Sequence, residues 1–378
     1  MSQLKGGPPT RLRRASEDER RPDPGDRAAP PVRLAGLGLA VPPHELSQLQ
    51  ARRTAERVFG GRWPDFARLA TSFETSGVER RYSVAPLDWF ETPRTWPERT
   101  ALYLESATAL FVEAARNALA DAGLAASDID TIVTISSTGI ATPTLEARAF
   151  AAMGFRSDLH RVPVFGLGCA GGVSGMAIAA RLARAAPGSN VLMVSIETCT
   201  LNFRDDRLSK ADVIASVLFG DGAAAACFTT GGDASAPAIG EGEEHLWPDT
   251  LGIMGWDVDA AGFGVIFDRS IPSFVEAHFR EAAAACLARA DLCPEDIARF
   301  VCHPGGAKVV EAIELTMGFE PGLLDHERGV LRDYGNMSAP TALFVLKRVM
   351  DEGRSGQMAL AALGPGFTVS LLPILLPG

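Results

Sequence analysis

The segment EAARNALADAGLAASDIDTIV, residues 113–133, recurs in altered form as EAAAACLARADLCPEDIARFV, residues 281–301. Aligned without gaps at an offset of 168, the two segments are identical at ten of 21 positions. Each one is typical of an alanine-rich helix, a loop with an Asp-Ile pair and an apolar strand. The repeat predicts a chain built from two related halves.

A second pair of segments extends the repeat at an offset of 167. Gly168-Cys169-Ala170-Gly171-Gly172-Val173-Ser174 falls opposite Gly335-Asn336-Met337-Ser338-Ala339-Pro340-Thr341. A helical stretch and then a strand-like run follow each segment, at residues 190–196 and 357–363. With the halves packed about a pseudo-twofold axis, we expect Cys169 and Asn336 at equivalent helix starts on the two sides of one cleft.

The chain divides into a tail and these two halves. Residues 1–31 carry seven Lys/Arg, five Asp/Glu and six Pro with almost no large apolar residue, which predicts a disordered tail and no signal peptide. Residues 32–238 form the predicted N-terminal half and residues 239–378 the C-terminal half, joined by the Gly-, Ala- and Ser-rich stretch 231–242. Short apolar runs alternate with Ala-rich stretches from residue 32 onward, so the fold class is α/β.

Composition excludes several classes of protein. The net charge of −10 argues against nucleic acid as a partner, because binding to phosphates needs clustered cations. Six cysteines form no CxxC pair and no zinc-type cluster, so we expect no metal and reduced thiols in the cytoplasm. The apolar run 371–376 is too short to span a bilayer and contains Pro373, which predicts a buried last strand and no integral membrane association.

Cys169 is the candidate nucleophile. It follows the strand-like Val164-Phe165 and a glycine turn, and it precedes a helical stretch from Met176 to Ala186. A thiol at a helix N-terminus experiences the positive end of the helix dipole, which lowers its pKa and favours the thiolate. A buried, inert cysteine is the ordinary alternative, but the flanking glycines favour a functional one.

His303 and Asn336 are its candidate partners. His303 directly follows the strand of the second repeat, at the strand end where α/β proteins place ligands. Asn336 heads a helix, where an N-cap is the ordinary role, but the repeat places it opposite Cys169. Cys, His and Asn fit either thiol proteolysis or acyl transfer with carbon–carbon bond formation, in which His and Asn donate hydrogen bonds to an enolate oxygen. The order of the residues and the duplication favour acyl transfer.

One competing interpretation is a dinucleotide site. Gly166-x-Gly168-x-x-Gly171 fits the fingerprint, follows a strand and opens a helix, with Glu197 at the end of the next strand-like run. Against a nucleotide-dependent oxidoreductase, the motif lies in mid-chain, Glu197 is 26 residues beyond Gly171, and Cys169 would face a pyrophosphate. We therefore rank this interpretation below acyl transfer.

Four segments carry a family resemblance. The chain from residue 32 to residue 376 resembles type III polyketide synthases, the chalcone-synthase-like branch of the thiolase superfamily. Initiating-type ketoacyl synthases are less similar, because they carry His-Gln-Ala-Asn where this chain has His-Pro-Gly-Gly. Bacterial enzymes that make alkylpyrones or alkylresorcinols look nearest, through segments 137–143 and 254–257. The four segments are Gly168-Cys169-Ala170-Gly171-Gly172, Leu218-Phe219-Gly220-Asp221-Gly222-Ala223-Ala224, His303-Pro304-Gly305-Gly306 and Gly335-Asn336-Met337-Ser338.

The resemblance implies a thiolase-like, five-layered αβαβα fold, a homodimer and iterative condensation of malonyl-CoA onto an acyl-CoA starter. Cys169 would hold the growing chain, and His303 would stabilise its thiolate as an ion pair. His303 and Asn336 would bind the thioester carbonyl of malonyl-CoA during decarboxylation. No metal or other cofactor is implied, because decarboxylation itself generates the carbanion. A pyrone or a resorcinol- or phloroglucinol-type product would follow by cyclisation.

The resemblance also assigns binding residues. Phe219 matches a gatekeeping aromatic residue, and Val265 stands where plant enzymes have a second one, which predicts a wider passage. Cys199, Asn202 and Ser338 match cavity-lining positions, and Thr142 matches a loop that reaches the partner's cavity.

For CoA, the resemblance points to Arg68, Lys308, Gly306 and Ala307. Thr71 and Thr75 stand where plant enzymes have further cations, so the docking of CoA differs from theirs.

Overall fold

The computed structural model describes residues 30–378 except residues 64 and 208. The predicted tail, apart from its last two residues, lies outside this range. The described chain is built on a mixed ten-stranded sheet in the order β12-β13-β14-β8-β1-β7-β6-β4-β5, with β9 paired to β14. These strands are β1 (Val32–Ala40), β4 (Thr131–Ile135), β5 (His160–Val164), β6 (Val191–Thr198), β7 (Asp221–Thr230), β8 (Ala238–Ile239), β9 (Glu243–Leu246), β12 (Arg299–Cys302), β13 (Gly356–Gly364) and β14 (Thr368–Leu376).

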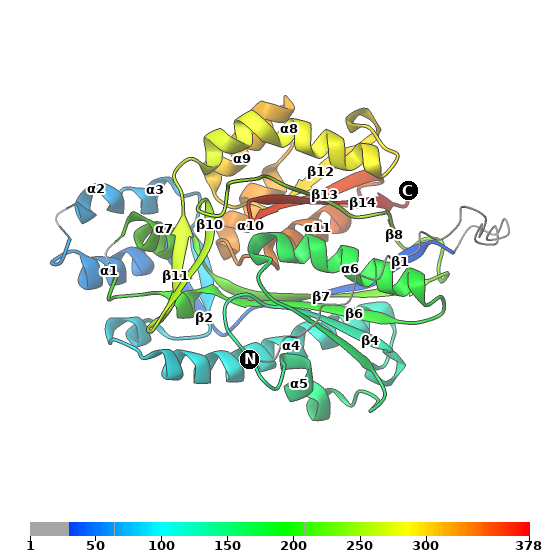
Figure 1. Cartoon of the computed structure of the whole chain (residues 1–378), viewed down its shortest axis with the longest axis horizontal. Coiled ribbons are helices and arrows are strands. Elements are labelled where there is room, and N and C mark those ends of the chain that lie inside the picture. The colour runs from blue at the N-terminus through cyan, green and yellow to red at the C-terminus, as the bar shows by residue number, and fades with distance from the viewer. Residues whose placement is uncertain (1–29, 64, 208) are drawn as a thin grey trace, which may run out of the picture.

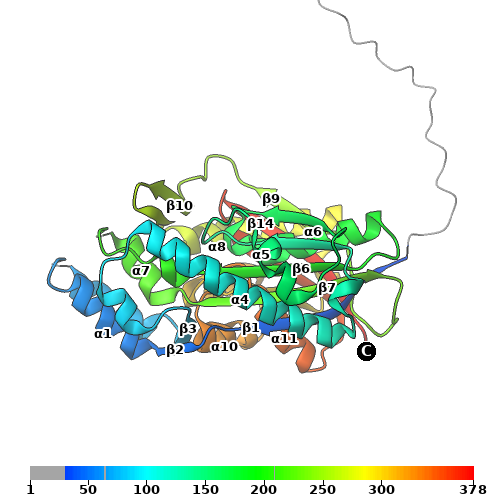
Figure 2. The ribbon, with the colours of Figure 1, turned by 90° about the horizontal axis from the view of Figure 1, so that it is seen from below.

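Helices cover the sheet in layers. Helices α4 (Trp96–Ala122) and α5 (Leu145–Met153) pack on the outer face of β1, β4, β6 and β7, and α8 (Ile271–Arg289) and α9 (Ala307–Met317) pack on the outer face of β12–β14. The strands of the N-terminal half (β1, β4, β6 and β7) and those of the C-terminal half (β12, β13 and β14) enclose α6 (Gly171–Ala185) and α11 (Thr341–Asp351). These two helices share one core with strands of both halves. Figure 1 shows α6 and α11 between these strand layers, and Figure 2 shows α4 across the outer face. The predicted thiolase-like αβαβα fold is confirmed.

The internal repeat corresponds to repeated structure. The 3₁₀ turn Ala126–Asp128 precedes β4, and the 3₁₀ turn Pro294–Asp296 precedes β12 at the predicted offset of 168. The first helix of the repeat ends at Gly123, whose φ of +65° suits a residue without a Cβ atom. The apolar run near the C-terminus belongs to β14, as predicted, and all of its residues except Leu375 are buried. The proposed boundary between residues 238 and 239 stays a prediction.

The glycines of the mid-chain motif allow the two halves to approach closely. A Cβ atom on Gly172 would lie 2.1 Å from the carbonyl oxygen of Ala339, and one on Gly168 would lie 2.7 Å from Pro365. A Cβ atom on Gly171 would lie 2.7 Å from Ile135. Gly168 and Gly172 therefore face the other half of the chain, whereas a Cβ atom on Gly166 would have no neighbour within 4 Å among the described residues. The packing at Gly168 and Gly172 argues against a pyrophosphate at the start of α6.

A smaller group of elements covers one end of the molecule. Helices α1 (Gln48–Phe59), α2 (Phe66–Ala70), α3 (Ser72–Thr75) and α7 (Lys210–Leu218) share an apolar core there. Beside them lie the hairpin of β10 (Met254–Asp259) and β11 (Gly262–Phe267), the pair β2 (His44–Ser47) and β3 (Arg80–Ser83), and helix α10 (Asp325–Tyr334). In residues 30–378, with the two gaps noted, no helix is long and apolar enough to cross a membrane.

Candidate active site

Cys169 lies in the 3₁₀ turn Gly168–Ala170, directly before α6. The residue is 6% exposed and lines a pocket together with Ser338 and Phe219. Burial raises the pKa of its thiol to about 11, although hydrogen bonds from the side chains of Ser338 and Asn336 lower it. The predicted net lowering of this pKa is therefore wrong, because desolvation outweighs the hydrogen bonds from Ser338 and Asn336.

Asn336 belongs to a tight turn and not to a helix start. Helix α11 begins at Thr341, so the expectation that Asn336 heads a helix is wrong. The Asn336 side-chain oxygen accepts the Ser338 amide at 2.8 Å, and its Nδ2 donates to the Gly305 carbonyl at 3.1 Å. These two bonds fix the amide so that its nitrogen is the donor on the Cys169 side. The backbone of Asn336 also pairs with the segment around Phe219. The Asn336 amide donates to the Leu218 carbonyl, and the Asn336 carbonyl accepts the Gly220 amide.

His303 directly follows β12, as predicted. Its backbone amide donates to Ala361 on β13 at 2.8 Å, and the residue is 4% exposed. Neither ring nitrogen has a hydrogen-bond partner among the described residues, and burial lowers the pKa of the imidazole to about 4. A buried, neutral imidazole without a partner remains available for a ligand.

The three candidate catalytic residues come from three loops that meet at one place. Asn336 links them, because its side chain lowers the pKa of the Cys169 thiol and donates a hydrogen bond to the loop that follows His303. A Cβ atom on Gly364, at the end of β13, would lie 2.8 Å from the Ala170 amide, so the strand beside His303 also ends at the Cys169 turn. The N-terminal half thus contributes the Cys169 thiol, and the C-terminal half contributes the His303 ring and the Asn336 amide.

Two pockets adjoin at four shared residues. The first contains Cys169, and the second extends toward α1 and the 3₁₀ helix Leu87–Glu91, where Leu46, Ala51 and Phe90 line it. Both pockets are lined mainly by apolar groups. The four shared residues are Cys199, Phe219, Trp256 and Val265.

The structure places three of the six predicted substrate-binding residues at this junction. Phe219 and Val265 line both pockets, as does Cys199. Asn202 lines the second pocket, where its side chain donates to the Thr138 carbonyl at 2.9 Å. Thr142 is exposed and lines neither pocket of its own chain.

The predicted CoA-binding residues lie outside both pockets. Arg68 is an exposed residue of α2 that forms a 3.6 Å ion pair with Asp65, and Lys308 is exposed in the first turn of α9. Gly306 is buried before α9, and a Cβ atom there would lie 3.6 Å from Leu218. Gly306 and Ala307 are therefore close to the segment that carries Phe219.

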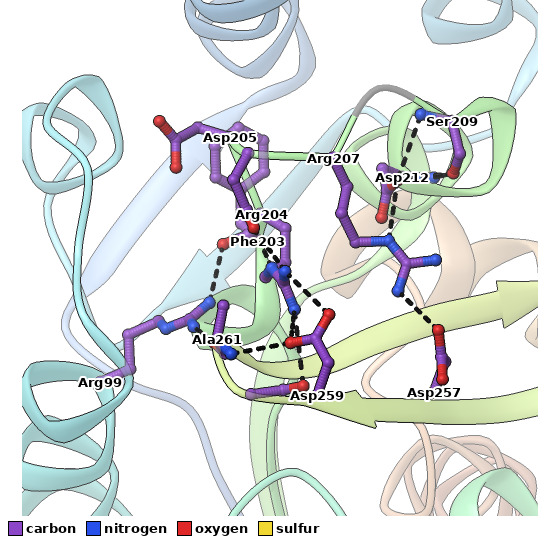
Figure 3. A network of polar contacts seen from close by, with 12 residues as sticks. Arg99, Phe203, Arg204, Asp205, Arg207, Ser209, Asp212, Asp257, Asp259 and Ala261 are labelled. Atoms are coloured by element: carbon purple, nitrogen blue, oxygen red, sulfur yellow. Dashed lines mark hydrogen bonds and ion pairs between the residues drawn. The ribbon is translucent and has the colours of Figure 1, made fainter.

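The hairpin that supplies Trp256 and Val265 is held by arginines (Figure 3). Arg204 is 4% exposed and pairs with Asp206 at one side and with Asp259 of the hairpin at 2.9 Å. Arg207 pairs with Asp257 of the hairpin at 3.3 Å. The ion pairs fix the wall that the two pockets share.

Glu197 is a buried residue that the sequence interpretation assigned only to the rejected nucleotide site. It is 0% exposed, and one carboxyl oxygen accepts the Ser137 amide at 3.0 Å and the Thr138 hydroxyl at 2.8 Å. The other oxygen has no partner among the described residues. Ser137 and Thr138 line the Cys169 pocket, so Glu197 fixes its wall. An acidic residue within an apolar strand run was the signal in the sequence.

Comparison with known proteins agrees with this arrangement. The family models for chalcone and stilbene synthases match residues 89–233 with the N-terminal domain and residues 240–375 with the C-terminal domain. A putative chalcone synthase of Bacillus subtilis is 33% identical over 355 residues, which cover 90% of this chain and 97% of that protein. The 1,3,6,8-tetrahydroxynaphthalene synthase of Streptomyces peucetius is 36% identical over 344 residues, covering 88% of this chain and 90% of that protein.

A solved structure supports the same class. The 1,3,6,8-tetrahydroxynaphthalene synthase of Streptomyces coelicolor superposes with a TM-score of 0.86 at 27% identity, covering 92% of this chain and 99% of that one. Fold and matched domains define a condensing enzyme that joins acyl units. The chain belongs to the chalcone and stilbene synthase family, and it is a type III polyketide synthase that condenses malonyl-CoA.

The buried carboxyl of Glu197 predicts a pH-dependent stability. Burial raises the pKa of this group from 4.5 to about 8. Between these values the folded chain binds a proton that the unfolded chain lacks, so this group makes the protein less stable as pH rises toward 8. Because Gln cannot ionise and keeps the acceptor for Ser137 and Thr138, the melting temperature of Glu197→Gln relative to the wild type should increase from pH 5 to pH 9. Calorimetry measures this difference in melting temperature, with Glu79→Gln at an exposed position as the control. A melting-temperature difference that stays constant or falls as pH rises would contradict the assignment.

Proposed function

We propose that Cys169 carries the acyl chain while His303 and Asn336 stabilise the enolate. The observation that carries this proposal is the convergence of the Cys169 turn, the His303 loop and the Asn336 turn through the Asn336 side chain. Burial raises the pKa of the Cys169 thiol and lowers that of the His303 imidazole, so it favours the neutral pair over the thiolate–imidazolium ion pair that the resemblance implies. Attack on the starter therefore needs a proton acceptor, and His303 has ring nitrogens without another partner.

The proposed reaction consists of acylation of Cys169 followed by decarboxylative condensation. The Cys169 sulfur attacks the thioester carbonyl of the starter, the thiol proton passes to His303, and CoA leaves with that proton. Malonyl-CoA then loses CO₂, and the electron pair of the broken bond forms an enolate whose oxygen accepts hydrogen bonds from His303 and Asn336. The enolate carbon attacks the acyl carbonyl carbon on Cys169, and the Cys169 sulfur leaves as the thiolate. We propose that no metal or cofactor takes part, because loss of CO₂ supplies the carbanion.

We further propose an aliphatic starter, with an alkylpyrone or a resorcinol- or phloroglucinol-type product after cyclisation. The second pocket supports this, since it continues past Val265 with apolar residues and would accept a hydrocarbon chain whose thioester carbon remains on Cys169. Relatives differ in product: some are named tetrahydroxynaphthalene synthases, and one from Amycolatopsis balhimycina is named 3,5-dihydroxyphenylacetyl-CoA synthase. A panel of starters, including malonyl-CoA alone, separates these outcomes.

A homodimer in the cytoplasm is part of the proposal. Strand β5 is an edge strand of the sheet, and three of its five residues are exposed. Phe165, directly after β5, and Ile140 are 55% and 54% exposed. An exposed strand edge beside apolar side chains is a surface that proteins cover. All six cysteines are free, which suits a reducing compartment. Sedimentation of a monomer at micromolar concentration, or export of the protein in cell fractionation, would contradict these proposals.

Replacing Cys169 tests the catalytic assignment. Wild-type protein, incubated in EDTA with dodecanoyl-CoA and radiolabelled malonyl-CoA, should release CoA and form a labelled polyketide. Cys169→Ala should form neither product nor an acyl-enzyme detectable by intact-protein mass spectrometry, because the attacking sulfur is absent. Asn336→Ala should still become acylated but decarboxylate malonyl-CoA about 100-fold more slowly, the usual cost of one oxyanion donor. Cys293→Ala, at an exposed cysteine, is the control. Full polyketide output from Cys169→Ala would refute the assignment.

Narrowing the junction of the pockets tests the starter. In Val265→Phe the larger ring occupies the passage, so kcat/KM for dodecanoyl-CoA relative to acetyl-CoA should fall about tenfold or more, as expected when a pocket excludes several methylene groups. Val258→Phe is a matched control, because Val258 lies on the same hairpin but is 55% exposed. An unchanged ratio in Val265→Phe would show that the chain does not pass this residue.

A further inference from the structure

The strand that carries His303 has an unpaired outer edge. Among the residues that the structure describes, β12 is the last strand of the sheet on its side and is paired only with β13. The His303 amide donates to Ala361 of β13, and successive amides of an extended strand point in opposite directions. The amide of Cys302 therefore points away from the sheet. A buried amide in that position needs an acceptor from another element.

Glu327 supplies this acceptor. One oxygen of its carboxylate accepts the Cys302 amide at 3.0 Å, and the other pairs with Arg299 of the same strand at 2.7 Å. Glu327 is 0% exposed and Arg299 is 4% exposed. Because a buried ion pair loses its hydration, it contributes little net stability compared with apolar side chains of the same volume. The pair is thus better explained by the geometry that it imposes.

The helix of Glu327 leads directly to Asn336. Glu327 lies in the first turn of α10, and the last turn of that helix is followed by Gly335 and Asn336. A displacement of α10 relative to β12 would therefore move Asn336 relative to His303. The Glu327 carboxylate is the contact that joins the two elements at the residue before His303.

We propose that Glu327 is a positioning residue, which sets the distance between the His303 ring and the Asn336 amide so that both donate to one enolate oxygen. Arg299 holds the carboxylate in the orientation that reaches the Cys302 amide. This inference rests on the proposed roles of His303 and Asn336. The two carboxylate oxygens of Glu327 are bonded to Arg299 and to the Cys302 amide, so both residues act through their neighbours and not on the substrate.

Two charge-free double variants separate positioning from stability. Arg299→Met/Glu327→Gln removes the ion pair but keeps a carbonyl oxygen for the Cys302 amide, whereas Arg299→Met/Glu327→Met removes both. We expect the Gln variant to decarboxylate malonyl-CoA within about threefold of the wild-type kcat. The Met variant should lose about tenfold or more in kcat at unchanged KM, because small displacements of catalytic groups cost this much. Acylation of Cys169 by dodecanoyl-CoA, measured by mass spectrometry, should stay near the wild-type rate in both.

A neighbouring ion pair gives the matched control. Arg328, beside Glu327 on α10, pairs with Glu314 of α9 at a partly exposed position. Arg328→Met/Glu314→Met should leave both rates unchanged. Where the Arg299→Met/Glu327→Met variant does not fold, Glu327→Asp replaces it: the shorter side chain keeps the charge but withdraws from the Cys302 amide, and the same selective loss is expected.

The outcomes are distinguishable. Wild-type decarboxylation in the Met variant and in Glu327→Asp overturns the positioning role, as does an equal loss in the Gln and Met variants. If Asn336→Ala decarboxylates at the wild-type rate, the proposed function itself has failed, whatever the Glu327 variants do.

Discussion

The close contact between the two halves at α6 and α11 is the constraint on which the active site depends. Gly172 has no room for a Cβ atom against the Ala339 carbonyl, and Gly168 has none against Pro365. Because Cys169 lies between these glycines and Ala339 lies three residues after Asn336, this contact brings the thiol and the amide to one place. Larger residues would separate the halves and with them the catalytic groups, since packed interiors accommodate extra atoms only by moving backbone.

Three buried carboxyl groups stabilise the loops around this contact. Glu197 accepts the Ser137 amide, Asp221 accepts the amides of Val84 and Thr200, and Glu327 accepts that of Cys302. Burial raises the pKa of each, to about 8, 6 and 7 respectively. Each carboxyl thus satisfies a backbone donor at the end of a strand or in a loop where no neighbouring strand can do so. The three carboxyl groups that order these loops are therefore harder to ionise than they would be in water.

The sequence predicted what is local or repeated, and it missed what depends on distant contacts. The repeat at an offset of 168 gave the matching 3₁₀ turns before β4 and β12, and the motif around Cys169 gave the turn before α6. The helix start at Asn336 and the lowered thiol pKa were wrong, because an Asn–Ser turn and desolvation decide them. Glu327 was missed, since its partners lie 25 and 28 residues away and no spacing rule connects them.

Both pockets have mainly apolar linings, and the first of them contains Cys169. Burial there strengthens hydrogen bonds to a developing oxyanion, and the same burial favours the neutral thiol and the neutral imidazole. Beyond Val265 the second pocket is lined by Leu46, Ala51 and Phe90, and also by the charged residues Arg81, Arg204 and Asp212. Because the hairpin wall between them is fixed by Arg204 and Arg207, chain length in the second pocket can vary while the geometry at the sulfur stays constant. On the proposed function, chemistry and starter selection would depend on different residues of these adjoining pockets.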